Sequence, residues 1–152
     1  MEVIERKIGE YILSTDKRKI DIGIVHRFLS EESYWSKGIP IEIVKGSIDN
    51  SLCFSVTSEG ELLAFARVIS DYHTFAYLAD VFVVSTYRKK GLSKLLLKFI
   101  VQHPHLQNLR RFCLGTHDAH SLYEKFGFKL ISKPEFFMEI KHEDLYEKFK
   151  QG

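Results

Sequence analysis

The chain of 152 residues is long enough for one domain with a substantial core and too short for two ordinary ones, so we expect a single domain over residues 1–152. Hydrophobic residues make up 45% and charged residues 28%, a balance that excludes an intrinsically disordered chain. The formal net charge of +2 gives no general indication of a nucleic-acid or membrane partner. No stretch approaches the roughly 20 apolar residues that span a bilayer.

The N-terminal sequence and the two cysteines indicate a reducing compartment. The opening residues, MEVIERKIGEYIL, are charged throughout and lack the apolar core of a secretory signal. Cys53 and Cys113 stand alone inside apolar runs, where they cannot form a disulfide or metal-binding framework. We therefore expect a cytoplasmic protein with two buried thiols.

The N-terminal third of the chain predicts one strand and two helices. The strand is expected over residues 11–16. Apolar residues at helical spacing predict a helix over 21–30, which the Asp21 side chain can cap. A connector then leads to Pro40, which is suited to open a second helix over 41–48.

The middle of the chain changes to the periodicity of strands. The runs at 52–57 and 61–70 flank a short turn that contains Gly60, and they predict a β-hairpin. Residues 76–84, AYLADVFVV, are almost continuously apolar, which is typical of a central strand covered on both faces. A largely buried helix is expected over 92–101.

The C-terminal third predicts a strand at 111–115 and a short helix at 118–126. FKLIS at 128–132 and EFFMEIK at 135–141 are expected to form a final pair of strands, the last of which could support a dimer edge. The order of elements combines an antiparallel meander with a strand–helix–strand crossover. It predicts an α+β fold on a mixed, mostly antiparallel sheet flanked by helices.

The junction after the apolar strand carries the most informative chemistry. Arg88, Lys89 and Lys90 precede Gly91, and the predicted helix begins immediately afterwards. A helix N-terminus exposes unpaired N–H groups and about half a positive charge, and glycine lets a ligand approach the backbone closely. Together with the Ser93 hydroxyl, these groups predict a pyrophosphate site. A solvated basic loop is the alternative interpretation.

The pattern Arg-x-x-Gly-x-Ser after an apolar strand resembles the acetyl-CoA-binding motif of the GNAT N-acetyltransferase superfamily. Arg88 and Gly91 match the motif, while Ser93 stands where the family usually has Gly or Ala. Downstream, LGTHDAHSLYEKFGF at 114–128 resembles the strand–helix segment of the same family. The resemblance extends over nearly the whole chain.

The resemblance implies an acetyl-CoA site along one of two splayed strands. In the family, the sheet opens in a V between the strands that correspond to 76–84 and 111–115, and the pantetheine arm pairs with the first of them as an added strand. The residues implied in binding are Phe82, Val83, Val84, Arg88, Lys89, Lys90, Gly91, Leu92 and Ser93. The first three are expected to act through backbone groups, and the loop amides and the Arg88 side chain hold the pyrophosphate.

Two residues are candidates for the chemistry of acetyl transfer. Tyr123 aligns with the tyrosine that the family commonly uses to protonate the leaving CoA thiolate, and simple packing near the helix end is the alternative. Asp80 is the only charged residue of its strand, and a buried carboxylate is costly unless it is paired. It could accept the amine proton directly or through water, hold the ammonium group of the acceptor, or form a structural ion pair.

Three further residues are candidates for the acceptor side of the site. His73, in the turn before the same strand, is a second base candidate, although loop histidines are usually solvated. Tyr34 and Trp35 lie in the connector that usually lines the acceptor groove in this family, where a tryptophan either shapes the groove or covers the end of the core.

No metal site is expected. His117 and His120 flank Asp118, but this spacing lacks a convincing third ligand, and the resemblance implies no metal.

The basic residues are unevenly distributed along the chain. Residues 81–117 contain seven Lys or Arg and no Asp or Glu, so the remainder must carry −5 for the sum to be +2. No aromatic stacking pattern is interleaved with these cations, which disfavours a nucleic-acid partner. The distribution favours a small polyanionic cosubstrate.

The sequence thus predicts acetyl transfer from acetyl-CoA to a primary amine of a small molecule or peptide by direct attack. The resemblance implies that the Val83 amide polarises the thioester carbonyl, that Asp80 or water deprotonates the amine, and that Tyr123 protonates the thiolate. No acyl-enzyme is expected, because neither cysteine lies near these motifs. A catalytically silent sensor or regulatory module that binds acyl-CoA is the alternative, which the intact Tyr123 disfavours.

Overall fold

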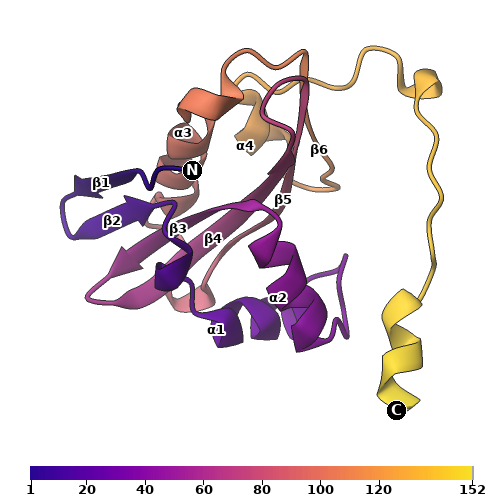
Figure 1. Ribbon diagram of the computed structural model, residues 1–152, viewed down its shortest axis with the longest axis horizontal. Helices are drawn as coiled ribbons and strands as arrows, with labels where there is room; N and C mark the ends of the chain where they lie inside the picture. The colour runs from indigo at the N-terminus through magenta and orange to yellow at the C-terminus, as the bar shows by residue number, and fades with distance from the viewer. Residues whose placement is uncertain (152) are drawn as a thin grey trace.

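The computed structural model describes the backbone of residues 1–151 and the side chains of residues 1–149. One six-stranded sheet has its strands side by side in chain order, and only the last pair is parallel (Figure 1). This confirms the mixed, mostly antiparallel sheet of an α+β fold. The strands are β1 (Glu5–Ile8), β2 (Tyr11–Ser14), β3 (Leu52–Ser58), β4 (Glu61–Ser70), β5 (Phe75–Val83) and β6 (Arg111–Leu114).

Helices cover both faces of the sheet and create two apolar clusters. On one face, α1 (Ile22–Arg27) and α2 (Ile41–Asp49) pack against Phe65 and Phe82. On the other face, α3 (Leu92–Val101) packs against residues such as Phe54. The short α4 (His120–Glu124) follows β6. Among residues 1–151, no helix is long and apolar enough to cross a membrane.

The first helix begins where the sequence predicts and ends irregularly. The Asp21 carboxylate accepts a hydrogen bond from the Ile24 N–H, so it caps α1. The helix then continues as a π-helical segment over Phe28–Glu32. This irregular end turns the chain into the connector that carries two of the predicted acceptor-site residues.

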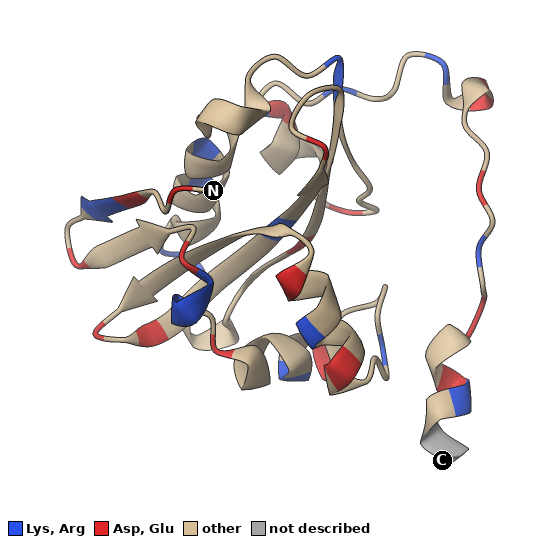
Figure 2. Cartoon of the chain, in the orientation of Figure 1, with Lys and Arg blue, Asp and Glu red and all other residues tan. Residues whose placement is uncertain are grey.

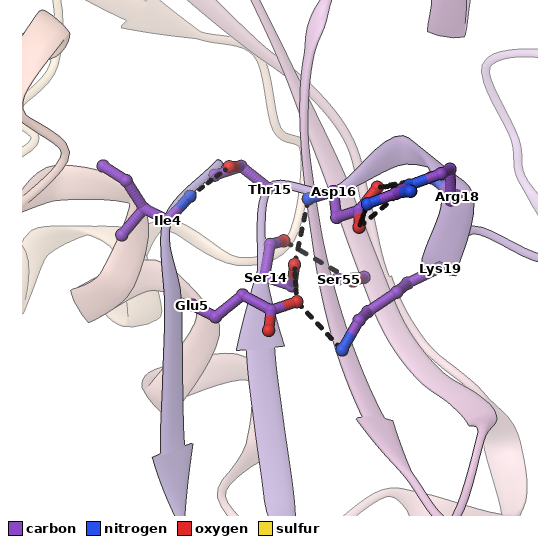
Figure 3. Close-up of polar contacts among 8 residues, drawn as sticks. All are labelled: Ile4, Glu5, Ser14, Thr15, Asp16, Arg18, Lys19 and Ser55. Atoms are coloured by element: carbon purple, nitrogen blue, oxygen red, sulfur yellow. Dashed lines mark hydrogen bonds and ion pairs between the residues drawn. The ribbon is translucent and has the colours of Figure 1, made fainter. Parts of the chain in front are cut away.

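The N-terminal edge strand β1 was not predicted. All four of its residues are exposed, so it has no buried face and no apolar alternation that would reveal a strand. Polar contacts fix it instead (Figure 3): the Ser14 hydroxyl donates to the Glu5 carboxylate at 2.7 Å, and Lys19 pairs with the same carboxylate at 2.9 Å. The hydrogen bonds from Lys19 and Ser14 lower the pKa of Glu5.

Two features of β5 shape the centre of the molecule. Its register with β4 slips at Asp80 and Val81, which together lie opposite Ala66, and Asp80 has a φ of +56°. On its other edge, β5 pairs with β6 only over Phe75–Leu78, which leaves Ala79–Val83 without a partner strand there. The V-shaped splay implied by the resemblance is therefore confirmed.

The final pair of strands predicted at 128–132 and 135–141 is wrong. Residues 129–151, which we call the C-terminal arm, instead leave the body of the molecule along an extended path (Figure 1). Its regular structure is limited to short 3-10 helices at Pro134–Phe136 and Leu145–Gln151. A strand needs the edge of another strand, and within this chain the arm does not return to the free edge of β6.

Both cysteines are free thiols, as expected. Cys53 is buried, and burial raises its pKa to about 12. Cys113 lies half-buried in β6, and burial raises its pKa as well.

Candidate active site

The loop between β5 and α3 presents a concave set of backbone N–H groups. Lys89 and Gly91 adopt left-handed conformations, with φ of +67° and +79°, on either side of Lys90. Such alternation turns successive N–H groups inward and forms an anion-binding nest. Gly91 is also the N-cap of α3, and no side chain caps that helix. The first N–H groups of α3 therefore point into the loop without a helical partner.

The side chains of this loop are anchored to the surrounding elements. Arg88 Nε donates to the Val83 carbonyl at 3.1 Å, and its guanidinium lies 4.0 Å from Glu32. The Lys90 ammonium lies 5.6 Å from the centre of the Tyr87 ring. Arg88 thus connects the loop to the end of β5, while the loop keeps its basic character.

The open edge of β5 leads from this loop into the splay. The Val84 N–H donates to the Leu63 carbonyl of β4 at 2.8 Å. Because neighbouring backbone groups of a strand face opposite edges, the Val83 backbone faces the splay, and that of Phe82 faces β4. By the same alternation Val81 shares the open edge. Of the three predicted backbone contacts, only Val83 is therefore placed to meet a ligand in the splay, and Val81 was missed because its direction depends on the bulge.

A cleft of about 530 Å³ lies between the second half of β5 and the segment that joins β6 to α4. It brings together side chains that the sequence places in distant segments, together with Arg67 of β4. Besides Arg67, the aromatic and titratable members are Tyr34, Trp35, Tyr77, Asp80, His117, Asp118 and Tyr123. Four of these, Tyr34, Trp35, Asp80 and Tyr123, are predicted site residues.

Asp80 is held by two donors inside this cleft. Its side chain is 6% exposed, and it accepts hydrogen bonds from Arg67 Nε and, at 2.8 Å, from the Trp35 indole N–H. Arg67 also donates to the Ser51 hydroxyl at 3.1 Å. Of the roles considered for Asp80, the structure shows the structural ion pair, which it forms with Arg67. Arg67 was missed, although a lone arginine inside the apolar run ELLAFARVIS is a signal that could have identified it.

The aromatic residues of the connector form one wall of the cleft. The Trp35 ring lies 6.0 Å from Phe28 and 4.9 Å from Tyr34, between ring centres. Tyr34 in turn stacks on His117 at 3.8 Å. His117 was considered only as a metal ligand, and its place in the cleft was missed. Its Nδ1 lies 3.2 Å from Asp118, and among residues 1–151 no group of three or more His, Cys, Asp or Glu could hold a metal ion.

Tyr123 stands between this cleft and a neighbouring groove of about 790 Å³, and it lines both. Burial raises its pKa, with smaller contributions from Tyr34 and Asp118. The phenol therefore stays protonated at neutral pH and can donate its proton. No hydrogen bond engages its hydroxyl among the side chains of residues 1–149.

His73 is not brought to the cleft. It precedes β5, and five strand residues, about 16 Å, separate Phe75 from Asp80. Its N–H and ring nitrogen contact Asp71, whose carboxylate also accepts from Thr74. Hydrogen bonds from Thr74, His73 and Phe75 hold the pKa of Asp71 well below its usual range. His73 thus belongs to a structured turn outside the cleft.

The open edge of β5 thus lies between a loop with uncapped helix N–H groups and a cleft lined by a protonated phenol. Residues 22–128 match the model of the acetyltransferase (GNAT) family, and the chain belongs to this family. Its members use acetyl-CoA as the acetyl donor.

Individual relatives agree with this assignment. A crystal structure from Xanthomonas campestris pv. campestris, assigned to the GNAT acetyltransferases, has 48% sequence identity and a TM-score of 0.88 over 92% of this chain and 99% of that one. A Gibberella zeae protein that carries an acetyltransferase assignment is 26% identical over 140 residues, 77% of each chain. A GNAT acetyltransferase from Elizabethkingia anophelis with acetyl-CoA bound shares the fold, with a TM-score of 0.61, 13% identity and coverage of 90% and 91%.

Proposed function

We propose that this protein is an N-acetyltransferase that transfers the acetyl group of acetyl-CoA to a primary amine by direct attack. One observation carries the proposal. The open edge of β5 runs between the Gly91 loop and the cleft that Tyr123 lines, which supports a phosphate site at one end of this edge and a proton donor at the other.

The residues of the loop and the splay fit the chemical groups of coenzyme A. The left-handed residues Lys89 and Gly91 and the uncapped start of α3 suit a pyrophosphate. A Cβ atom added to Gly91 would meet no protein atom within 4 Å, so open space lies beside this backbone where a phosphate could approach. The Val83 backbone suits a pantetheine amide, which would extend the sheet by hydrogen bonding.

The cleft residues suit an amine acceptor. Tyr34, Trp35 and Tyr77 offer ring faces that attract an ammonium group. Asp80 is already compensated by Arg67, so we assign it to positioning Trp35 and the bulged backbone. The proton that leaves the amine nitrogen passes to water or to His117, whose Nδ1 faces Asp118 and which lines the cleft.

Bound acetyl-CoA supplies an electrophilic thioester carbonyl and a thiolate leaving group. The amine nitrogen forms the new bond to the carbonyl carbon, and the carbon–sulfur bond breaks. In the proposed reaction, the N–H of Val83 or Val81 stabilises the carbonyl oxygen, and Tyr123 gives its proton to the sulfur. The sulfur keeps the electron pair of the broken bond and accepts the Tyr123 proton, so coenzyme A leaves as the free thiol.

Thiol release tests the proposal directly. Purified protein is mixed with acetyl-CoA and a panel of polyamines, aminoglycosides, amino acids and peptides, and free thiol is followed against an amine-free control. We expect amine-dependent release, with the acetylated amine detected by mass spectrometry. Acetyl-CoA binding without release on any amine would favour a silent sensor, and failure to bind acetyl-CoA would overturn the assignment of the loop.

A further inference from the structure

The central strands of the sheet carry almost no charge apart from one ion pair (Figure 2). Across β3, β4 and β5 the charged residues are Glu61, at the first position of β4, Arg67 and Asp80. Arg67 and Asp80 pair with each other, and their side chains are 17% and 6% exposed. Both residues also line the cleft of the proposed active site. Because the desolvation of two buried charges offsets their attraction, stability alone does not explain such a pair, and its place in the cleft indicates a role toward the ligand.

Arg67 is the one strong cation of this cleft that could bind a carboxylate of the acceptor. Among the described residues that line the cleft, no other is a lysine or an arginine. The Arg67 Nε donates to Asp80 and its Nη1 donates to Ser51, while no hydrogen bond engages its Nη2 among the side chains of residues 1–149. An arginine fork with free donors holds a carboxylate by two parallel hydrogen bonds. Here Asp80 takes one arm of the fork and cancels its charge.

The remainder of the cleft suits a cation. Asp118 adds a second carboxylate, 72% exposed, so one arginine faces two carboxylates and the cleft carries a net negative charge while His117 is neutral. Tyr34, Trp35 and Tyr77 line the cleft and are all exposed, so parts of their rings remain accessible to a ligand. Such rings attract an ammonium group. A carboxylate brought into the same space would find no cation that is not already paired.

We propose that the Asp80–Arg67 pair selects the acceptor by charge: the cleft takes an amine that has no carboxylate close to its amino group, and it rejects α-amino acids. The inference rests on the proposed function, because it names the acceptor class of the same site. Asp80 neutralises Arg67 and repels a second carboxylate, so the pair acts against the wrong ligand as much as for the right one. This role gives a physical reason for two buried charges where apolar side chains of similar volume can be equally stable.

Trp35 allows ligand binding to be measured without turnover. It is the single tryptophan of the chain, it lines the cleft, and its indole N–H contacts Asp80, so its fluorescence should respond to a ligand there. The matched probes are phenethylamine, phenylalaninol and phenylalanine, of which only the last carries a carboxylate; cadaverine and lysine form a second pair. At pH 7 the native chain should bind phenylalaninol roughly 100-fold more tightly than phenylalanine, and cadaverine more tightly than lysine.

Asp80→Asn tests whether the ion pair is the determinant. The substitution uncovers the charge of Arg67 and keeps an oxygen for the Trp35 indole, so the preference for phenylalaninol over phenylalanine should fall below about 10-fold. Asp80→Asn/Arg67→Met also removes the cation and should abolish this gain in phenylalanine binding. The matched control is Asp118→Asn, which removes the other carboxylate of the cleft. Because that side chain is 72% exposed, the control should change the preference by less than about 3-fold.

Three results would overturn selection by charge. They are equal binding of phenylalaninol and phenylalanine by the native chain, no fluorescence response to any of the amines, and a preference that Asp80→Asn leaves unchanged. The first two need no variant to fold. Failure of the proposed reaction is a separate outcome: selective amine binding without thiol release from acetyl-CoA would remove the enzyme and keep the selection. Thiol release with amines and amino acids alike would keep the enzyme and remove the selection.

Discussion

Replacing Arg67 by methionine should be the most destabilising single change in the cleft. The substitution keeps most of the aliphatic volume but leaves the Asp80 carboxylate, 6% exposed, with only the Trp35 indole as a donor. Removal of one partner of a buried ion pair costs about 3–5 kcal/mol, because the remaining charge stays buried without compensation. For a chain of this size each kcal/mol lowers the melting temperature by about 2–4 °C, so we expect a decrease of about 6–20 °C.

Calorimetry and urea unfolding of Arg67→Met measure this effect, and the protein supplies its own control. Arg18 pairs with Asp16 at 3.0 Å, but its side chain is 88% exposed. Arg18→Met should therefore cost less than about 1 kcal/mol. If Arg67→Met loses no more stability than Arg18→Met, then the Asp80 carboxylate is solvated in the folded protein, and the argument for a buried, compensated pair is refuted.

Two further predictions concern the proposed reaction. Tyr123→Phe should lower kcat roughly 100-fold or more with little change in acetyl-CoA affinity, and an unchanged kcat would exclude Tyr123 as the acid. In the native protein the Tyr123 pKa is raised above its ordinary 10.0, so ionisation of this phenol should not reduce kcat below about pH 10. Gly91→Ala and Gly9→Ala both force alanine into a left-handed conformation, so each should cost about 1 kcal/mol. Only Gly91→Ala should raise KM for acetyl-CoA, by about 10-fold or more. Equal KM values in the two variants would show that Gly91 is not part of the phosphate site.

Strong hydrophobic periodicity made most of the fold predictable. The apolar run AYLADVFVV predicts a strand and LSKLLLKFIV predicts a helix, and both lie where expected, although alternate residues of the strand are exposed or half-buried. The misses have opposite causes. β1 has no buried face, so nothing in ERKI distinguishes it from a loop. EFFMEIK has the pattern of a strand, yet among the described residues no strand edge pairs with it.

The cleft was only partly predictable, because its residues meet through tertiary contacts. Trp35 and Asp80 are distant in sequence, and their 2.8 Å hydrogen bond follows from the π-helical end of α1 and the bulge in β5. Neither irregularity has a periodic signature. The same bulge decides which backbone groups of β5 face the splay, so the resemblance could indicate the strand end but not select Val81 and Val83 over their neighbours.

The bulge also separates the two roles considered for Asp80. In β5, Asp80 and Val81 together lie opposite one residue of β4. If the two strands paired one-to-one here, each later residue of β5 would face the opposite edge, and the Val83 backbone would face β4. Asp80 adopts its φ of +56° there, a conformation that Asn also adopts readily and that costs Ala about 1–2 kcal/mol. Asp80→Asn keeps an oxygen for the Trp35 indole, while Asp80→Ala loses that contact and also strains the backbone.

If Asp80 positions the bulge, Asp80→Asn should keep most of the native affinity for acetyl-CoA and a measurable kcat, and Asp80→Ala should lose both. If Asp80 is the base, the two variants should lose kcat equally. The kcat that remains in each should then vary with pH as the amine loses its proton without help from the protein. Steady-state kinetics of the pair over pH 6–9, with acetyl-CoA affinity from calorimetry, separates these outcomes. Because Arg67 already compensates the Asp80 carboxylate, we expect the first outcome, in which Asp80→Asn is less impaired than Asp80→Ala. Equal loss of kcat in the two variants, at unchanged acetyl-CoA affinity, would show that Asp80 is the base.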